Sequence, residues 1–103
     1  MRYLFLLNPT AGKRDCTAEL APAIQAAAQR AGIPPEKRKV VVTQYAGHAR
    51  ELAAEAAHTA QADGEPVRIW TAGGDGTFNE ALTGAQGCGL AAVGGLPLSL
   101  IHI

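Results

Sequence analysis

The sequence has no excess of charge of either sign, since 9 Lys and Arg residues balance 9 Asp and Glu residues and the formal net charge is +0. It also has no stripe of basic residues. Surfaces that bind nucleic acids concentrate Lys and Arg to neutralise phosphates. We therefore expect this chain to have no nucleic-acid partner.

Cysteine is scarce, with only Cys16 and Cys88, and these lie far apart. Two such residues supply neither a disulfide scaffold nor the paired cysteines of a zinc site. The sequence therefore predicts no metal site built from its own side chains. Free thiols also fit a reducing, cytoplasmic location.

Long hydrophobic runs are absent as well. The first apolar run stops at Asn8-Pro9, short of the roughly 7–15 apolar residues that a signal peptide needs. No segment approaches the ~18 apolar residues of a membrane-spanning helix. We expect no transmembrane segment, and we interpret residues 3–7 as a buried strand.

Hydrophobic residues nevertheless make up 48% of the 103 residues, which is enough for the core of one domain or of part of one. Strands are predicted at residues 3–7, 40–42, 67–72 and 90–93, and helices at residues 18–31, 49–62 and 78–83. Pro22 is expected in the first turn of its helix, and Gly32 is expected as the C-cap. Alternating strands and helices predict βαβ units. We expect an α/β three-layer sandwich, with a mainly parallel sheet flanked by helices.

Three unusual loops each follow a predicted strand, at residues 8–13, 43–48 and 73–77. In an open α/β sheet, ligands bind beyond the carboxyl ends of the strands. Because all three loops leave that edge, they are expected to face one crevice. Their convergence predicts a ligand site there.

The loop at residues 73–77 reads Gly-Gly-Asp-Gly-Thr and carries the sharpest signal. Its glycines let the backbone approach a ligand and adopt positive φ. The loop leads into a predicted helix, whose first amides attract anions. The pattern is typical of phosphate binding, although it is neither GxxxxGK[ST] nor GxGxxG, since Asn79 stands where a third glycine would be.

Asp75 requires its own explanation, because a carboxylate beside a polyphosphate is repelled by it. It is useful there if it lies near a bridging Mg²⁺ or accepts the proton of an attacking hydroxyl. The alternative is that Asp75 only stabilises a tight turn.

Three motifs together resemble a known family. They are Asn8-Pro9-Thr10-Ala11-Gly12-Lys13, then Thr43 with Gly47-His48-Ala49, then Gly73-Gly74-Asp75-Gly76-Thr77-Phe78-Asn79-Glu80. In order and spacing the sequence is similar to the diacylglycerol kinase catalytic domain, over residues 2 to about 98. That family includes bacterial lipid kinases, sphingosine kinases and ceramide kinases.

The resemblance implies the N-terminal, nucleotide-binding part of a lipid kinase, which transfers the γ-phosphate of ATP to a lipid hydroxyl with Mg²⁺. It implies peripheral contact with a membrane that carries the lipid acceptor. Diacylglycerol, a sphingoid base, ceramide and an undecaprenol-type alcohol all remain open as acceptors. The nucleotide-binding residues that it implies are Asn8, Pro9, Thr10, Ala11, Gly12, Thr43, Gly73, Gly74, Asp75, Gly76, Thr77, Asn79 and Glu80. Asp75 is also the implied catalytic residue.

The end of the sequence departs from the family. Residues 94–98 resemble the start of a segment that usually reads Pro-x-Gly-Thr-x-Asn-Asp, but Ser99 and Leu100 stand where Gly-Thr is expected. The family's second, β-rich domain does not follow. We expect residues 1–98 to be a partial, truncated catalytic domain and residues 99–103 a non-matching tail. We also expect this chain alone to be inactive as a kinase.

Two other functions remain open on the sequence: an NAD kinase-like fragment, since that family also carries Gly-Gly-Asp-Gly-Thr, and a non-catalytic nucleotide-binding remnant. Other side chains carry weaker signals. Two interpretations of Lys13 and Arg14 remain open: contact with a phosphate, or a place in a solvated loop. His48 is interpreted as a helix-cap or packing residue, and Trp70 as a core residue.

Overall fold

The computed structural model describes residues 1–8, 17–72 and 75–95. In chain order its elements are β1 (Arg2–Leu7), α1 (Thr17–Arg30), the short 3₁₀ helix η1 (Pro35–Lys37), β2 (Arg38–Val42), α2 (His48–Asp63), β3 (Val67–Ala72), α3 (Asp75–Gly84) and β4 (Ala91–Gly95). Helices and strands alternate, as the sequence predicts.

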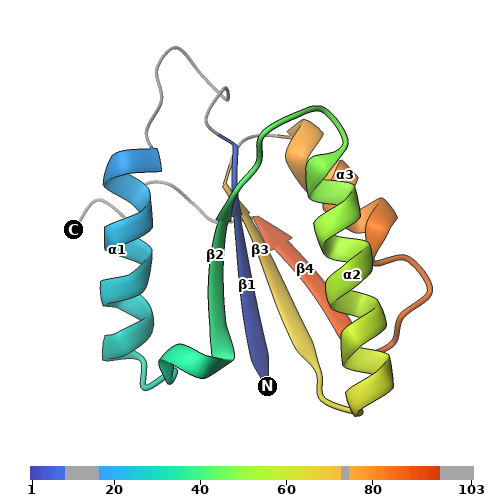
Figure 1. The fold of residues 1–103 in the computed structure, drawn as a ribbon, viewed down its shortest axis with the longest axis horizontal. Helices are drawn as coiled ribbons and strands as arrows, with labels where there is room; N and C mark the ends of the chain where they lie inside the picture. Colours follow the sequence, from blue (N-terminus) through green and yellow to red (C-terminus); the bar gives the residue numbers. More distant parts are fainter. Residues whose placement is uncertain (9–16, 73–74, 96–103) are drawn as a thin grey trace.

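The strands form one sheet in the order β2-β1-β3-β4, and all neighbouring strands are parallel. Helix α1 covers one face, and α2 and α3 lie together on the other (Figure 1). The predicted α/β three-layer sandwich is therefore confirmed.

The position of β1 between two layers of helices explains why its sequence is apolar without alternation. Leu4 and Leu6 pack in the core between the sheet and α2 and α3. Phe5 and Leu7 pack in the second core, against Ile24 of α1. Because successive side chains point to opposite faces, a strand covered by helices on both sides must be apolar at every position.

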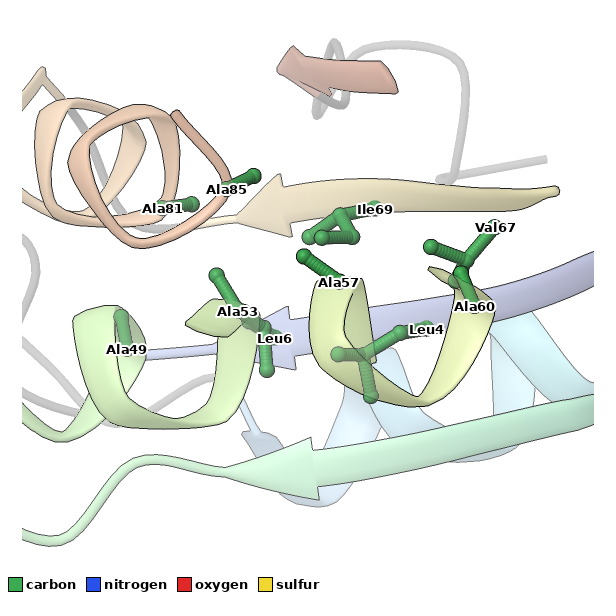
Figure 2. Close-up of a cluster of buried hydrophobic side chains, with 10 residues drawn as sticks. All are labelled: Leu4, Leu6, Ala49, Ala53, Ala57, Ala60, Val67, Ile69, Ala81 and Ala85. Carbon is green, nitrogen blue, oxygen red and sulfur yellow. The ribbon is translucent and has the colours of Figure 1, made fainter. Parts of the chain in front are cut away.

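The core on the α2 side is built mainly from alanine (Figure 2). Its buried members are Leu4, Leu6, Ala49, Ala53, Ala57, Ala60, Val67, Ile69, Ala81 and Ala85. Small side chains let α2 and α3 approach each other closely. At Gly84, a Cβ would lie 2.2 Å from the carbonyl oxygen of Arg50. The absence of a side chain at Gly84 is therefore a packing requirement between the two helices.

Helix α1 ends as predicted and begins differently. Gly32, with φ +82°, donates its N–H to Gln29, while Ile33 donates to Ala28, which is a Schellman cap. Because α1 begins at Thr17, Pro22 lies in its second turn, so the prediction of a first-turn proline was wrong. Pro22 is exposed, and its ring removes one amide donor from the hydrogen bonds of the helix.

Helix α3 begins at Asp75, three residues earlier than predicted. Gly76 is helical and has no positive φ, so the expectation of a left-handed loop residue was wrong at this position. An acidic residue in the first turn interacts favourably with the helix dipole and stabilises the helix, which helps to explain the early start. The motif therefore continues into the first turn of the helix.

Strand β4 extends to Gly95, beyond its predicted end. Gly94 pairs in register with Trp70 of β3, whose ring would lie 2.8 Å from a Cβ at Gly94. The ring of Trp70 thus covers the glycine of the neighbouring strand. Trp70 is partly buried and packs against the core on the α1 side, in agreement with its interpretation as a core residue.

Candidate functional site

The sheet has a topological switch point between β1 and β3. The chain runs from β1 through α1 to β2 on one side, and then through α2 to β3 on the other side of β1. At such a point the loops leave the sheet in opposite directions and open a crevice for ligands. Asn8 directly follows β1, and α3 starts shortly after β3.

Asn8 and Thr77 join the two sides of this switch point. The Asn8 side chain donates from Nδ2 to Oγ1 of Thr77 at 3.0 Å. The backbone N–H of Asn8 donates to the carbonyl group of Ala72 at 2.9 Å. Thr77 is 4% exposed. The first and third predicted loops thus meet at the switch point, beside the carboxyl ends of β1 and β3.

Thr43 fixes the second loop beside β1. Its backbone N–H donates to the carbonyl oxygen of Leu7 at 2.8 Å, and its hydroxyl donates to the same oxygen at 3.3 Å. The side chain is buried. The carboxyl ends of β2 and β1 are therefore held together by both the backbone and the threonine side chain.

A cavity of about 660 Å³ opens at this edge of the sheet, and we name it the switch-point cavity. Its lining comes from all three predicted segments: Asn8, Val42, Thr43, Gln44, Tyr45, Ala46, Ala49, Thr77 and Glu80. This volume lies in the ~300–1,000 Å³ range of sites for small molecules and cofactors. The structure thus brings four of the predicted residues together: Asn8, Thr43, Thr77 and Glu80.

The other predicted residues are placed differently. Asn79 is exposed on α3 and lines a separate hollow with Leu82 and Gln86. Asp75 is the first residue of α3. The remaining predicted residues, namely Pro9, Thr10, Ala11, Gly12, Gly73 and Gly74, lie outside the described residues, as do Lys13 and Arg14.

Gly76 is not required by the packing of the described residues. A Cβ placed there would meet none of their atoms within 4 Å, and its φ suits any amino acid. It lies in the first turn of α3, where backbone N–H groups have no partner within the helix. A glycine there leaves space that no other described residue fills, beside donors that attract anions.

The second loop contributes residues that the sequence did not single out. Tyr45 stacks on His48, with ring centroids 4.4 Å apart and an interplanar angle of 16°. The backbone N–H of Gln44 donates to Nδ1 of His48 at 3.0 Å. The Tyr45 hydroxyl donates to Glu51, and this hydrogen bond raises the pKa of Tyr45. The interpretation of His48 as a cap or packing residue agrees with these contacts.

A second hollow, of about 240 Å³, lies toward the start of β1 and β2 and includes Arg2, Lys37 and Arg38. Two of its cations, Arg2 and Lys37, are paired with Glu65. Glu65 accepts from Lys37 at 2.7 Å, from Arg2 at 3.1 Å and from the N-terminal amino group at 3.2 Å. Hydrogen bonds from Lys37 and the amino terminus lower the pKa of Glu65 from 4.5 to about 2. Arg2 and Lys37 are therefore engaged in ion pairs, while Arg38 donates to the side chain of Gln25 and to the carbonyl group of Ile33.

The described residues contain no candidate for a membrane-spanning helix and none for a metal-binding cluster. None of their helices combines the length and the hydropathy that crossing a bilayer requires. Their His, Cys, Asp and Glu side chains form no group of three or more that could hold a metal ion.

Comparison with known proteins adds two findings. The sequence model of the family described as "Diacylglycerol kinase catalytic domain" matches residues 2–101. A solved structure from Bacillus anthracis str. Sterne, described as "a putative diacylglycerol kinase", aligns with a TM-score of 0.65 and 23% sequence identity over 93% of this chain. This chain covers 30% of the length of that structure. No curated protein sequence matches.

Proposed function

This chain belongs to the diacylglycerol kinase catalytic domain family, and we propose that it is the ATP-binding part of a lipid kinase. The reaction proposed is transfer of the γ-phosphate of ATP to a lipid hydroxyl. The domain proposed comprises residues 1–98, with residues 99–103 as a tail. A membrane lipid is the acceptor, and the protein acts in the cytoplasm at the membrane surface.

The observation that carries the proposal is the switch-point cavity. It lies where open α/β sheets bind nucleotides, and its lining includes polar side chains from the end of β1, the loop after β2 and helix α3. Asn8 and Thr77 meet across the switch point at 3.0 Å. Phosphoryl transfer is catalysed mainly by positioning and by charge stabilisation, which such a cradle of donors supplies.

In this proposal the phosphates bind beside the first turn of α3. The open space at Gly76 admits a phosphate close to the backbone N–H groups. Mg²⁺ enters with the nucleotide, since this ion is commonly held by substrate phosphates and one or two carboxylates. Glu80, which lines the cavity, and Asp75, at the start of α3, are the proposed carboxylates. The ion would neutralise phosphate charge.

The lipid-binding part of the site is proposed to lie outside these 103 residues. The chain spans 30% of the length of the B. anthracis structure. Transfer needs an acceptor held in line and a site closed against water. We therefore propose that this chain alone binds ATP without phosphorylating a lipid.

The experiment that tests the nucleotide site uses two glycine variants. Gly76→Ala should leave the free energy of unfolding unchanged or raise it by up to about 1 kcal/mol, because alanine favours helix and meets no described atom. It should weaken Mg-ATP binding by roughly tenfold or more, which corresponds to about 1.4 kcal/mol. Calorimetric titration and urea unfolding measure the two effects separately.

Gly89→Ala is the matched control, since a Cβ there also meets no described atom and its φ is not positive. It lies away from the cavity and should bind Mg-ATP like the unchanged chain. Equal affinity of all three proteins would contradict the proposed position of the phosphates. Saturable binding of NAD, in place of ATP, would favour the NAD kinase-like alternative.

A further inference from the structure

Tyr45 is exposed and yet held in one position. Its side chain lies at the surface, with the residue 56% exposed. Its ring stacks on His48 at 4.4 Å, and its hydroxyl donates to Glu51. Fixing a surface side chain removes rotamer freedom, which costs free energy. A ring fixed in this way is preorganised for a partner.

One face of the Tyr45 ring is stacked on His48, and the residue lines the switch-point cavity. The near-parallel stack, at 16°, means that His48 covers one face of the Tyr45 ring. Tyr45 lines the switch-point cavity, whereas His48 does not. His48 therefore supports the ring from behind, and the high exposure of Tyr45 leaves ring surface accessible beside the cavity.

The loop that carries Tyr45 is closed by the same histidine. His48 Nδ1 accepts the N–H of Gln44 at 3.0 Å, which ties the residue before Tyr45 to the start of α2. Gly47, with φ +89°, allows the sharp turn between them. Backbone and ring are thus held by the same histidine, and Tyr45 forms part of the cavity wall.

We propose that Tyr45 is the surface on which the nucleobase of the bound nucleotide stacks, with His48 and Glu51 as its positioning residues. The inference rests on the proposed function. Asn8 and Thr77 form one part of the cavity, beside the proposed phosphate site, and Tyr45 forms another part from a different loop. Because every base has an apolar π-face, stacking on Tyr45 adds affinity for nucleotides without selecting one base.

The test compares a ligand that has a base with one that lacks it. Mg-ATP and magnesium tripolyphosphate are titrated calorimetrically into the unchanged chain, Tyr45→Ala and Tyr45→Phe. Tyr45→Ala should weaken ATP binding roughly 5- to 100-fold, as expected for loss of base stacking. It should leave tripolyphosphate binding unchanged. Tyr45→Phe keeps the ring and should retain most of the ATP affinity.

Two further variants sharpen the test. His48→Ala should weaken ATP more than tripolyphosphate, while His48→Phe, which keeps a stacking ring, should restore part of the difference. Leu82→Ala removes another exposed apolar side chain, on α3, and should change neither affinity. Melting curves check that each variant is folded.

The outcomes separate this inference from the proposed function. If the unchanged chain binds ATP and Tyr45→Ala binds it equally well, the stacking proposal is overturned and the nucleotide site stands. Equal loss of ATP and tripolyphosphate would overturn it too, because Tyr45 would then act on the phosphate site. A folded, unchanged chain that binds neither ligand would overturn the proposed function, and the stacking role with it.

Discussion

Glu65 shows what a single side chain contributes to this fold. Its carboxylate joins β1, η1 and the end of α2, through Arg2, Lys37 and the N-terminal amino group. The side chain is 22% exposed, so the pairs are only partly screened by water. Hydrogen bonds from Lys37 and the N-terminal amino group hold its pKa far below the ordinary value.

Glu65 should therefore make the stability of the protein depend on pH in the acid range. Its pKa is about 2 when folded and 4.5 ordinarily, so its stabilising contribution is complete above pH 4.5. That contribution is lost as the pH falls through about 2. In Glu65→Gln, melting temperatures measured between these pH values should vary less than in the unchanged chain.

Glu36→Gln is the control for this titration, because Glu36 is an exposed carboxylate of the nearby η1. It should retain the pH dependence of the unchanged chain. If both variants and the unchanged chain lose stability equally as the pH falls, the ion pairs of Glu65 do not cause the pH dependence of stability.

Asp75 is the residue on which catalysis should depend most. If it accepts the proton of the attacking hydroxyl, Asp75→Asn should lower the rate of phosphoryl transfer roughly 10²–10⁴-fold in a kinase-active form of the protein. Its Mg-ATP affinity should change far less. The measurement is the transfer of labelled phosphate from ATP to lipids. Asp63→Asn is the control, because Asp63 is the last residue of α2, at the end of that helix away from the switch-point cavity. Near-full activity of Asp75→Asn would reassign Asp75 to a structural role.

At the scale of elements, the packing of α2 against α3 depends on alanine and glycine residues, whose side chains are small or absent. The buried face of α2 consists of Ala49, Ala53, Ala57 and Ala60. Gly84, at the end of α3, lies against the backbone of α2. Helices with so little apolar side chain gain stability from close approach and many van der Waals contacts, so extra volume at the interface is harmful.

Gly84→Ala should destabilise the protein by about 1–3 kcal/mol, although alanine favours helix, because backbone atoms of α2 must move to accommodate the methyl group. The nearest is the Arg50 carbonyl oxygen, 2.2 Å from the added Cβ. Urea unfolding measures the change. Gly89→Ala, in open space, should stay within about 0.5 kcal/mol of the unchanged chain. Equal stability of the two variants would contradict the close packing of the helices.

The sequence predicted the elements well because each one has a local signal. The apolar run of β1, the helical spacing of alanines in α2 and the glycines that end α1 and α2 are all readable in order. The start of α3 could not be predicted in this way, because glycines indicate a loop and Gly76 is nevertheless helical. The end of β4 was missed because Gly94 and Gly95 have low strand propensity, and pairing with β3 overrides it.

For the whole molecule, the sheet order decides which residues form the site. Sequence reasoning predicted that three loops face one crevice, and the structure places Asn8, Thr43, Thr77 and Glu80 around one cavity. It could not predict the bond between Asn8 and Thr77, which are 69 positions apart, because this depends on β1 lying next to β3. Tyr45 was missed for a similar reason: its stack with His48 exists only once the loop is closed.

The most direct test of this account is to map where Mg-ATP binds by following the backbone amide signals of the isotope-labelled chain during an NMR titration. The account predicts saturable shifts at Asn8, Thr43, Thr77 and Glu80, and none at Lys37 and Glu65 at the opposite end of the sheet. Shifts confined to the basic hollow around Arg2 and Lys37, or a spectrum that does not change, would contradict it.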